Sequence, residues 1–289
     1  MPARAVWAAA LFFMISAVSL PADDNQPAQA SESLPLRTLK GIVEKQRAIL
    51  ADAAKSGGQL DQESLRDQLQ GVCHDYELLL RDDPDFAAGY ASYGLLLCKV
   101  GMDKQALGLL LQSDKLDPTD PVVKNEIAVC LAETGKPIDA VGYYMAAIGL
   151  EPKEPLYHYQ LGMLLWAAHD DLIRTGDWTR ASVESAMNDA FRHAAELAPD
   201  RIEFTYRYAE SFRDMQNPDW DKALKVWAML EEKAQTPIER QTMRLQAAHD
   251  LIMEGKFDYA QILINTVTEP ALAAQKQKLI AQLAESAKK

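Results

Sequence analysis

Cysteine is scarce in this chain, which has only Cys73, Cys98 and Cys130 among 289 residues. A small disulfide-stabilised domain needs an even and denser set, so the sequence excludes a disulfide framework. Cys73 and Cys130 have apolar neighbours, which predicts buried thiols that behave as small hydrophobic groups. Cys98 and Cys130 fall in helical segments that we expect to be neighbours, so a single disulfide between them stays open.

Motifs of common catalytic and nucleotide-binding sites are also missing. The sequence has no His-Glu-x-x-His zinc motif, no glycine-rich phosphate loop and no Gly-x-Ser-x-Gly nucleophile turn. His158 and His169 are three helical turns apart and His193 falls on the expected partner helix, a set that would allow a metal site. Surface or core-edge histidines are the commoner case. We therefore expect no metal, no cofactor and no enzymatic activity.

Positive charge is in deficit, because 30 Lys and Arg stand against 42 Asp and Glu, which gives a net charge of −12. Proteins that bind nucleic acid rely on clustered Lys and Arg, so this balance argues against DNA or RNA as a partner. The hydrophobic share of 48% and the charged share of 25% are ordinary for a soluble protein.

Long apolar runs are absent except at the N-terminus, where Ala5 to Leu20 carries no charge and follows Arg4. This run is somewhat short for a membrane span and is typical of a secretory signal peptide, which we place at residues 1–22. An uncleaved signal anchor is the alternative, and it would be the chain's one link to a membrane. Residues 23–35 are polar and rich in Ala, Pro and Ser, which predicts a disordered spacer.

The most regular repeating pattern in the sequence begins at Tyr90 and recurs 34 residues later. Its first copy has anchors at Tyr90, Tyr93, Gly94, Leu97, Gly101, Ala106, Leu110, Ser113 and Pro118. Its second has them at Ile127, Ala128, Leu131, Gly135, Ala140, Tyr144, Ala147 and Pro152. The pattern resembles the tetratricopeptide (TPR) repeat, which has large, Leu-Gly, Tyr, small, aromatic and Pro anchors on this period. The resemblance implies an all-α, right-handed solenoid of antiparallel helix pairs, the TPR superhelix.

Repeats that follow this 34-residue period cover nearly all of the chain after residue 35 and leave no room for a separate catalytic domain. The predicted units are an atypical capping repeat (36–85), two regular repeats (86–119 and 120–153), an extended repeat (154–200), two further repeats (201–236 and 240–269) and a closing helix (270–287). Gly101 and Gly135 suit the left-handed residue that ends a helix. Ala106 and Ala140 are small enough to let the two helices of a pair approach closely.

The repeat at 154–200 is longer than its neighbours in both of its helices. Leu165 to Gly176 spans eleven residues, whereas Leu97 to Gly101 spans four, and the second helix gains six. Two helices lengthened almost equally predict a hairpin that projects by about 10 Å. A flexible loop at 169–175 is the alternative, and it is disfavoured because apolar residues continue the helical spacing.

The family resemblance also implies a partner-binding groove lined by the first helices of successive repeats. Carried onto this sequence, the lining positions are Leu95, Asn125, Val129, Tyr159, Met163, Trp166, Tyr206, Glu210 and Arg213. Family members that grip a peptide carboxylate have Lys, Asn and Arg at such positions, and the apolar Leu95, Val129 and Met163 indicate that this clamp is absent. An apolar segment or amphipathic helix of a partner protein would then be the ligand. Filling of the groove by one of the chain's own terminal helices is the alternative.

These features favour an exported, non-enzymatic adaptor that binds another protein in a bacterial cell envelope. The alternative is a structural protein that self-assembles into a homo-oligomer through its stack ends or its projecting hairpin. A repeat scaffold is shared by many functions, so the sequence does not identify the partner.

Overall fold

The computed structural model describes residues 33–55 and 62–288, and every regular element within them is helical. The predicted signal peptide and most of the predicted spacer lie outside the described residues. Leu34 and Pro35, which we assigned to the spacer, instead form the start of the first described helix.

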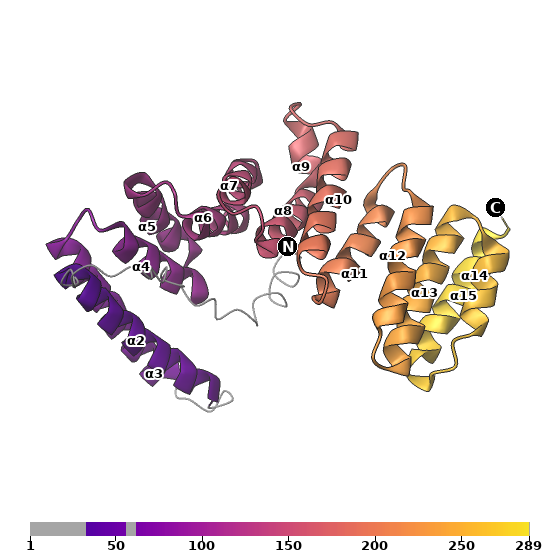
Figure 1. Cartoon of the computed structure of the whole chain (residues 1–289), viewed down its shortest axis with the longest axis horizontal. Coiled ribbons are helices and arrows are strands. Elements are labelled where there is room, and N and C mark those ends of the chain that lie inside the picture. Colours follow the sequence, from indigo (N-terminus) through magenta and orange to yellow (C-terminus); the bar gives the residue numbers. More distant parts are fainter. Residues whose placement is uncertain (1–32, 56–61, 289) are drawn as a thin grey trace, which may run out of the picture.

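The helices form one curved row (Figure 1). In chain order they are α2 (Leu34–Lys55), α3 (Gln62–Asp82), α4 (Ala87–Lys99), α5 (Asp103–Leu116), α6 (Pro121–Glu133), α7 (Pro137–Leu150), α8 (Pro155–Ala167), α9 (His169–Arg174), α10 (Arg180–Leu197), α11 (Ile202–Ser211), the 3₁₀ helix η1 (Phe212–Asp214), α12 (Trp220–Lys233), α13 (Pro237–Glu254), α14 (Phe257–Asn265), η2 (Pro270–Leu272) and α15 (Ala273–Ser286). Within the described ranges, no helix has the length and apolar character needed to cross a membrane.

Local sequence signals explain where these helices begin and end. Asp120 caps α6 by accepting hydrogen bonds from two backbone amides, and Thr236 forms a capping box with Glu239 at the start of α13. Gly101 and Gly135 follow α4 and α6 with φ angles of 76° and 80°. The left-handed conformation predicted for these two glycines is therefore confirmed.

Close packing inside each repeat depends on small residues at the helix crossings. A Cβ atom on Gly94 of α4 would lie 2.7 Å from Leu110 Cγ of α5, and one on Gly162 of α8 would lie 2.8 Å from the Phe191 ring of α10. Leu110 and Phe191 are fully buried. The glycines therefore allow a large side chain of the second helix to fill the space beside the first helix.

The extended repeat differs from the sequence-based expectation in one respect. Its first helix does not run unbroken to the tip, because α8 ends at Ala167, Ala168 caps it, and a separate short helix, α9, begins at His169. Leu172 of α9 is buried in the main hydrophobic core. Residues 169–174 are helical, so the alternative of a flexible loop there is wrong. Figure 1 shows α9 and the start of α10 beyond the ends of the neighbouring helices.

We predict that Gly162→Ala destabilises the fold by about 1–3 kcal/mol, because the new methyl group would overlap the Phe191 ring. Gly142→Ala is the matched control: Gly142 also lies within a helix, and its Cβ would meet nothing within 4 Å. Alanine there should stabilise by up to about 1 kcal/mol through helix propensity. Urea unfolding followed by circular dichroism measures both. Equal effects of the two substitutions would contradict this account of the crossing.

Candidate functional site

The nine predicted groove residues differ in how much surface they offer. Six are half-buried: Leu95, Val129, Tyr159, Tyr206, Glu210 and Arg213. Asn125 and Met163 are buried, with exposed fractions of 2% and 8%, and present little area to a partner. Trp166 is the most open of the nine at 38%. That these residues bind a partner remains a prediction, and Trp166 is the residue best placed for it.

Trp166 lies near the end of α8, beside an arginine of the next first helix, α11. The Arg207 guanidinium is 4.9 Å from the centre of the Trp166 ring and 4.7 Å from that of Phe191. Arg207 also donates a hydrogen bond to Asp214 Oδ2 at 3.1 Å, and its side chain is only 13% exposed. Arg207 is held in place by Asp214 and by the two aromatic rings. It therefore covers one side of the Trp166 ring, and the exposed part of that ring faces solvent.

A cavity of about 480 Å³ opens next to Trp166, where the extended repeat meets η1. Its lining residues come from α8, α9, α10 and η1: Trp166, Ala167, His169, Asp170, Asp171, Arg174, Arg180, Met187 and Asp214. Most of these side chains are charged, so the cavity suits a polar group next to an aromatic anchor. The break at Ala168 is what brings the acidic and basic residues of α9 to this position.

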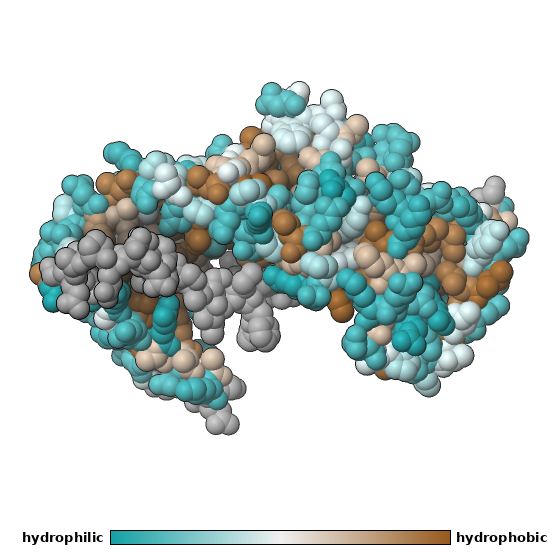
Figure 2. Space-filling model, viewed as in Figure 1, coloured by the Kyte–Doolittle hydropathy of each residue, from teal (hydrophilic) through white to brown (hydrophobic). Residues whose placement is uncertain are grey.

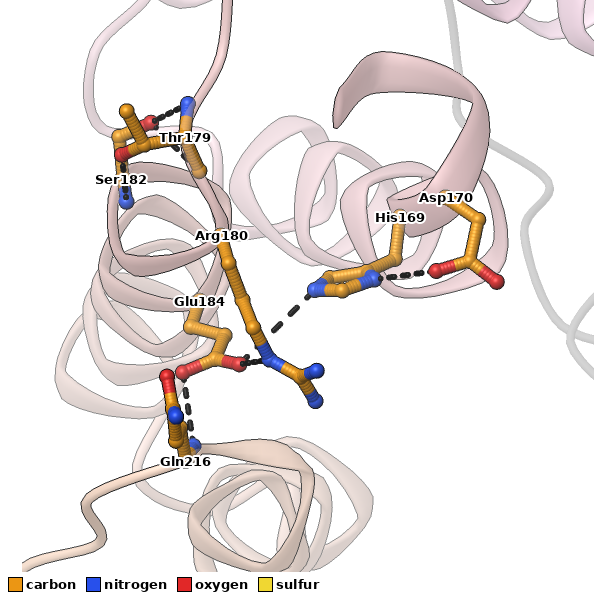
Figure 3. Close-up of polar contacts among 7 residues, drawn as sticks. All are labelled: His169, Asp170, Thr179, Arg180, Ser182, Glu184 and Gln216. Atoms are coloured by element: carbon orange, nitrogen blue, oxygen red, sulfur yellow. Dashed lines mark hydrogen bonds and ion pairs between the residues drawn. The ribbon is translucent and has the colours of Figure 1, made fainter. Parts of the chain in front are cut away.

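Glu184 holds Arg180, one of the residues that line this cavity (Figure 3). The residue is 4% exposed, and its carboxylate accepts hydrogen bonds from Arg180 Nε and from the backbone amide of Gln216, both at 2.7 Å. The Gln216 bond ties the segment before α12 to α10. His169 Nδ1 is 3.0 Å from Asp170 Oδ1, while its buried Nε2 lies 3.9 Å from Glu184 Oε1 and has no hydrogen-bond partner within the described structure.

Most polar residues at one end of the predicted groove form hydrogen bonds within the protein. Arg213 Nε donates to the fully buried Asp250, which also accepts a hydrogen bond from Trp227 Nε1 at 2.6 Å. Arg213 reaches Gln246 Oε1 at 2.9 Å, and Gln246 in turn donates to Tyr206 Oη at 2.7 Å. Two predicted groove residues, Tyr206 and Arg213, are thus brought together by α13. Their main role here is to connect consecutive repeats.

Glu210, in contrast, is a half-buried carboxyl between two arginines of its own segment. Burial raises the pKa of the Glu210 carboxyl, and the positive charges of Arg207 and Arg213 oppose that rise. Tyr159, the remaining aromatic residue of the predicted set, packs against the rings of Phe191 and Phe204. Tyr159 therefore contributes mainly to the contact between α8, α10 and α11.

Sequence reasoning missed Glu184, which holds the cavity residue Arg180, and Asp250, which forms the buried ion pair with Arg213. Glu184 and Asp250 are acidic residues with apolar neighbours in their helices. An acidic residue on an otherwise apolar helix face was the signal in the sequence that could have identified them. The three histidines considered as a metal set do not meet. His158 and His193 have ring centres 5.3 Å apart, whereas His169 points to Asp170 and Glu184 (Figure 3).

We predict that Asp250→Ala destabilises the protein by about 3–5 kcal/mol, because it removes the negative charge that pairs with Arg213 and leaves Arg213 Nε and Trp227 Nε1 without their acceptor. Asp221→Ala is the control, since Asp221 is 78% exposed and forms only an exposed ion pair with Lys256. That change should cost at most about 1 kcal/mol. Chemical denaturation of both variants tests the difference. A similar small loss in both would show that the buried pair does not join the repeats.

No protein-family model and no curated protein matches this chain. Among solved structures, the crystal structure of YrrB, described as a TPR protein with an unusual peptide-binding site, aligns with a TM-score of 0.56 and 14% identity over 74% of this chain and 98% of YrrB. PilW, described as a type IV pilus biogenesis factor, aligns with a TM-score of 0.54 and 9% identity over 87% of this chain and 100% of PilW. The structure of Naa15/Naa10 bound to HypK gives 0.55 and 14%, over 85% of this chain and 34% of the matched one. At these identities the similarity shows the fold, and the chain has an all-helical fold similar to that of TPR solenoid proteins.

Proposed function

We propose that this chain is a non-enzymatic TPR scaffold, exported to the bacterial cell envelope, that binds another protein through the first helices of its repeats. The observation that carries the proposal is the exposed Trp166 beside a charged cavity on an otherwise regular helical stack. Aromatic residues held against arginine are frequent anchors of protein interfaces. The peptide-binding site named for YrrB, which shares the fold, supports the same kind of role.

The distribution of surface hydrophobicity also supports a local anchor. In Figure 2 the hydrophobic residues form separate patches among hydrophilic ones, with no single continuous apolar face. A partner segment would therefore place one apolar side chain on Trp166 and direct its polar groups to the cavity. Asp170 and Asp171 supply negative charge for a basic group of the partner at the cavity.

The nine groove residues contribute unequally to this proposal. Trp166 and Glu210 offer contact surface, and Leu95 and Val129 extend that surface toward the N-terminal repeats. Asn125 and Met163 serve as packing residues beneath it because they are buried.

We predict that Trp166→Ala weakens partner binding by about 30-fold, the loss of an interface residue worth about 2 kcal/mol, and leaves the fold intact. Crosslinking capture from the native cell with the purified mature chain measures this. Tyr259→Ala is the matched control, because Tyr259 is 65% exposed on α14, far along the stack from Trp166 (Figure 1).

The proposal fails if Trp166→Ala captures the same proteins as the unchanged chain, or if the substitution lowers the melting temperature by several degrees with capture unchanged. In the second case Trp166 is a core residue. Recovery of only copies of this chain, together with a stable oligomer in light scattering, would favour the self-assembling alternative.

We further predict that the protein purified from the envelope fraction begins at Asp23, because the apolar run at 5–20 ends in Pro21-Ala22. Mass spectrometry of the intact protein checks the cleavage. A mature chain that retains residues 1–22 in the membrane fraction would instead identify an uncleaved signal anchor. Recovery of the full chain from the cytosol would overturn export.

A further inference from the structure

Two cysteines from neighbouring repeats and one carboxylate meet at the junction of three helices. Cys98 lies in the last turn of α4, Cys130 lies in α6, and Asp103 is the first residue of α5. The two sulfur atoms are 3.2 Å apart. The two Sγ atoms and one Asp103 carboxylate oxygen all lie within 4.8 Å of one another. This set is remote from Trp166 and takes no part in the proposed partner site.

The three side chains offer ligand atoms of two kinds, cysteine sulfur and carboxylate oxygen, gathered at one point of the stack. A cation bound there would take the two sulfur atoms, as thiolates, and the carboxylate oxygen as direct ligands.

We propose that Cys98, Cys130 and Asp103 form a binding site for a thiophilic divalent cation, with Zn²⁺ as the reference ion. Zinc binds cysteine sulfur and aspartate oxygen and accepts four ligands, so these three side chains would leave one position for water or a further carboxylate. Cys130 is fully buried, while Cys98 and Asp103 are half-buried and give the ion access from solvent. The bound ion would link α4 and α6, the first helices of two successive repeats, to α5, the helix between them.

The geometry favours a cation over a disulfide between the same residues. Two sulfur atoms on one tetrahedral zinc ion, each at 2.3 Å, lie about 3.8 Å apart, whereas a disulfide requires about 2.05 Å. The observed 3.2 Å is closer to the first value. A disulfide would additionally leave Asp103 without a role in the cluster.

Titration of the full chain with Co²⁺ under a phosphine reductant tests the proposal, because cobalt bound by thiolates gives a charge-transfer absorption in the near ultraviolet. We expect one equivalent of Co²⁺ to bind and to give this absorption. Added Zn²⁺ should displace the Co²⁺ and remove the absorption. Cys98→Ser and Cys130→Ser should each abolish the two-thiolate spectrum. Asp103→Asn should weaken binding by at least about tenfold and leave both thiolate bonds in place.

Cys73→Ser is the matched control, because Cys73 is the chain's third cysteine, is half-buried, and lies outside the cluster. It should bind cobalt as the unchanged chain does. A second readout does not depend on any substitution: Zn²⁺ should slow alkylation of Cys98 and Cys130 in the unchanged protein and leave alkylation of Cys73 unaffected. Circular dichroism confirms that each variant is folded.

Three results would overturn the proposal. The first is a folded, reduced chain that shows no thiolate absorption with Co²⁺. The second is an absorption that keeps its full intensity in both Cys98→Ser and Cys130→Ser. The third is a Cys98–Cys130 disulfide, found by peptide mapping of protein purified without reductant, together with no cation binding after reduction. The third outcome would show that the two cysteines pair with each other.

Discussion

The structure depends on how closely the two helices of a repeat approach each other. Gly94 and Gly162 leave just enough space for Leu110 and Phe191, and both of these large side chains are fully buried. This spacing fixes the distance at which the next repeat can stack, because each repeat contributes one face to the core of its neighbour. The positions of surface residues on the first helices, Trp166 among them, follow from that spacing.

A departure from regular stacking creates the candidate partner site. After α8 ends at Ala167, the separate helix α9 has Leu172 in the core and His169 and Asp170 at the cavity. Buried ionic groups such as Glu184 contribute little net stability, since their removal from water is costly. Their hydrogen bonds to Arg180 and to the Gln216 amide instead specify one arrangement of α10 relative to the segment before α12.

Local signals made part of this structure predictable from the sequence. The left-handed glycines after α4 and α6 and the paired helices of the regular repeats follow from residues only a few positions apart. The break at Ala168 has no such signal, because alanine favours a continuous helix. Burial of Asn125 and Met163 depends on neighbouring repeats. The family's rule for groove positions assumes regular stacking, and it cannot report how deeply each side chain is covered.

The two proposed sites also differ in whether they depend on regular stacking of the repeats. The region around Trp166 arises where the repeat is longest, and three of its charged residues, Asp170, Asp171 and Arg174, come from α9. The cysteine–aspartate cluster arises within regular repeats, where the ordinary stacking of α4 on α6 brings together residues that are 32 positions apart. A metal at that cluster would strengthen one junction of the stack without altering the surface at Trp166. Because the two sites share no residue, loss of either leaves the physical argument for the other unchanged.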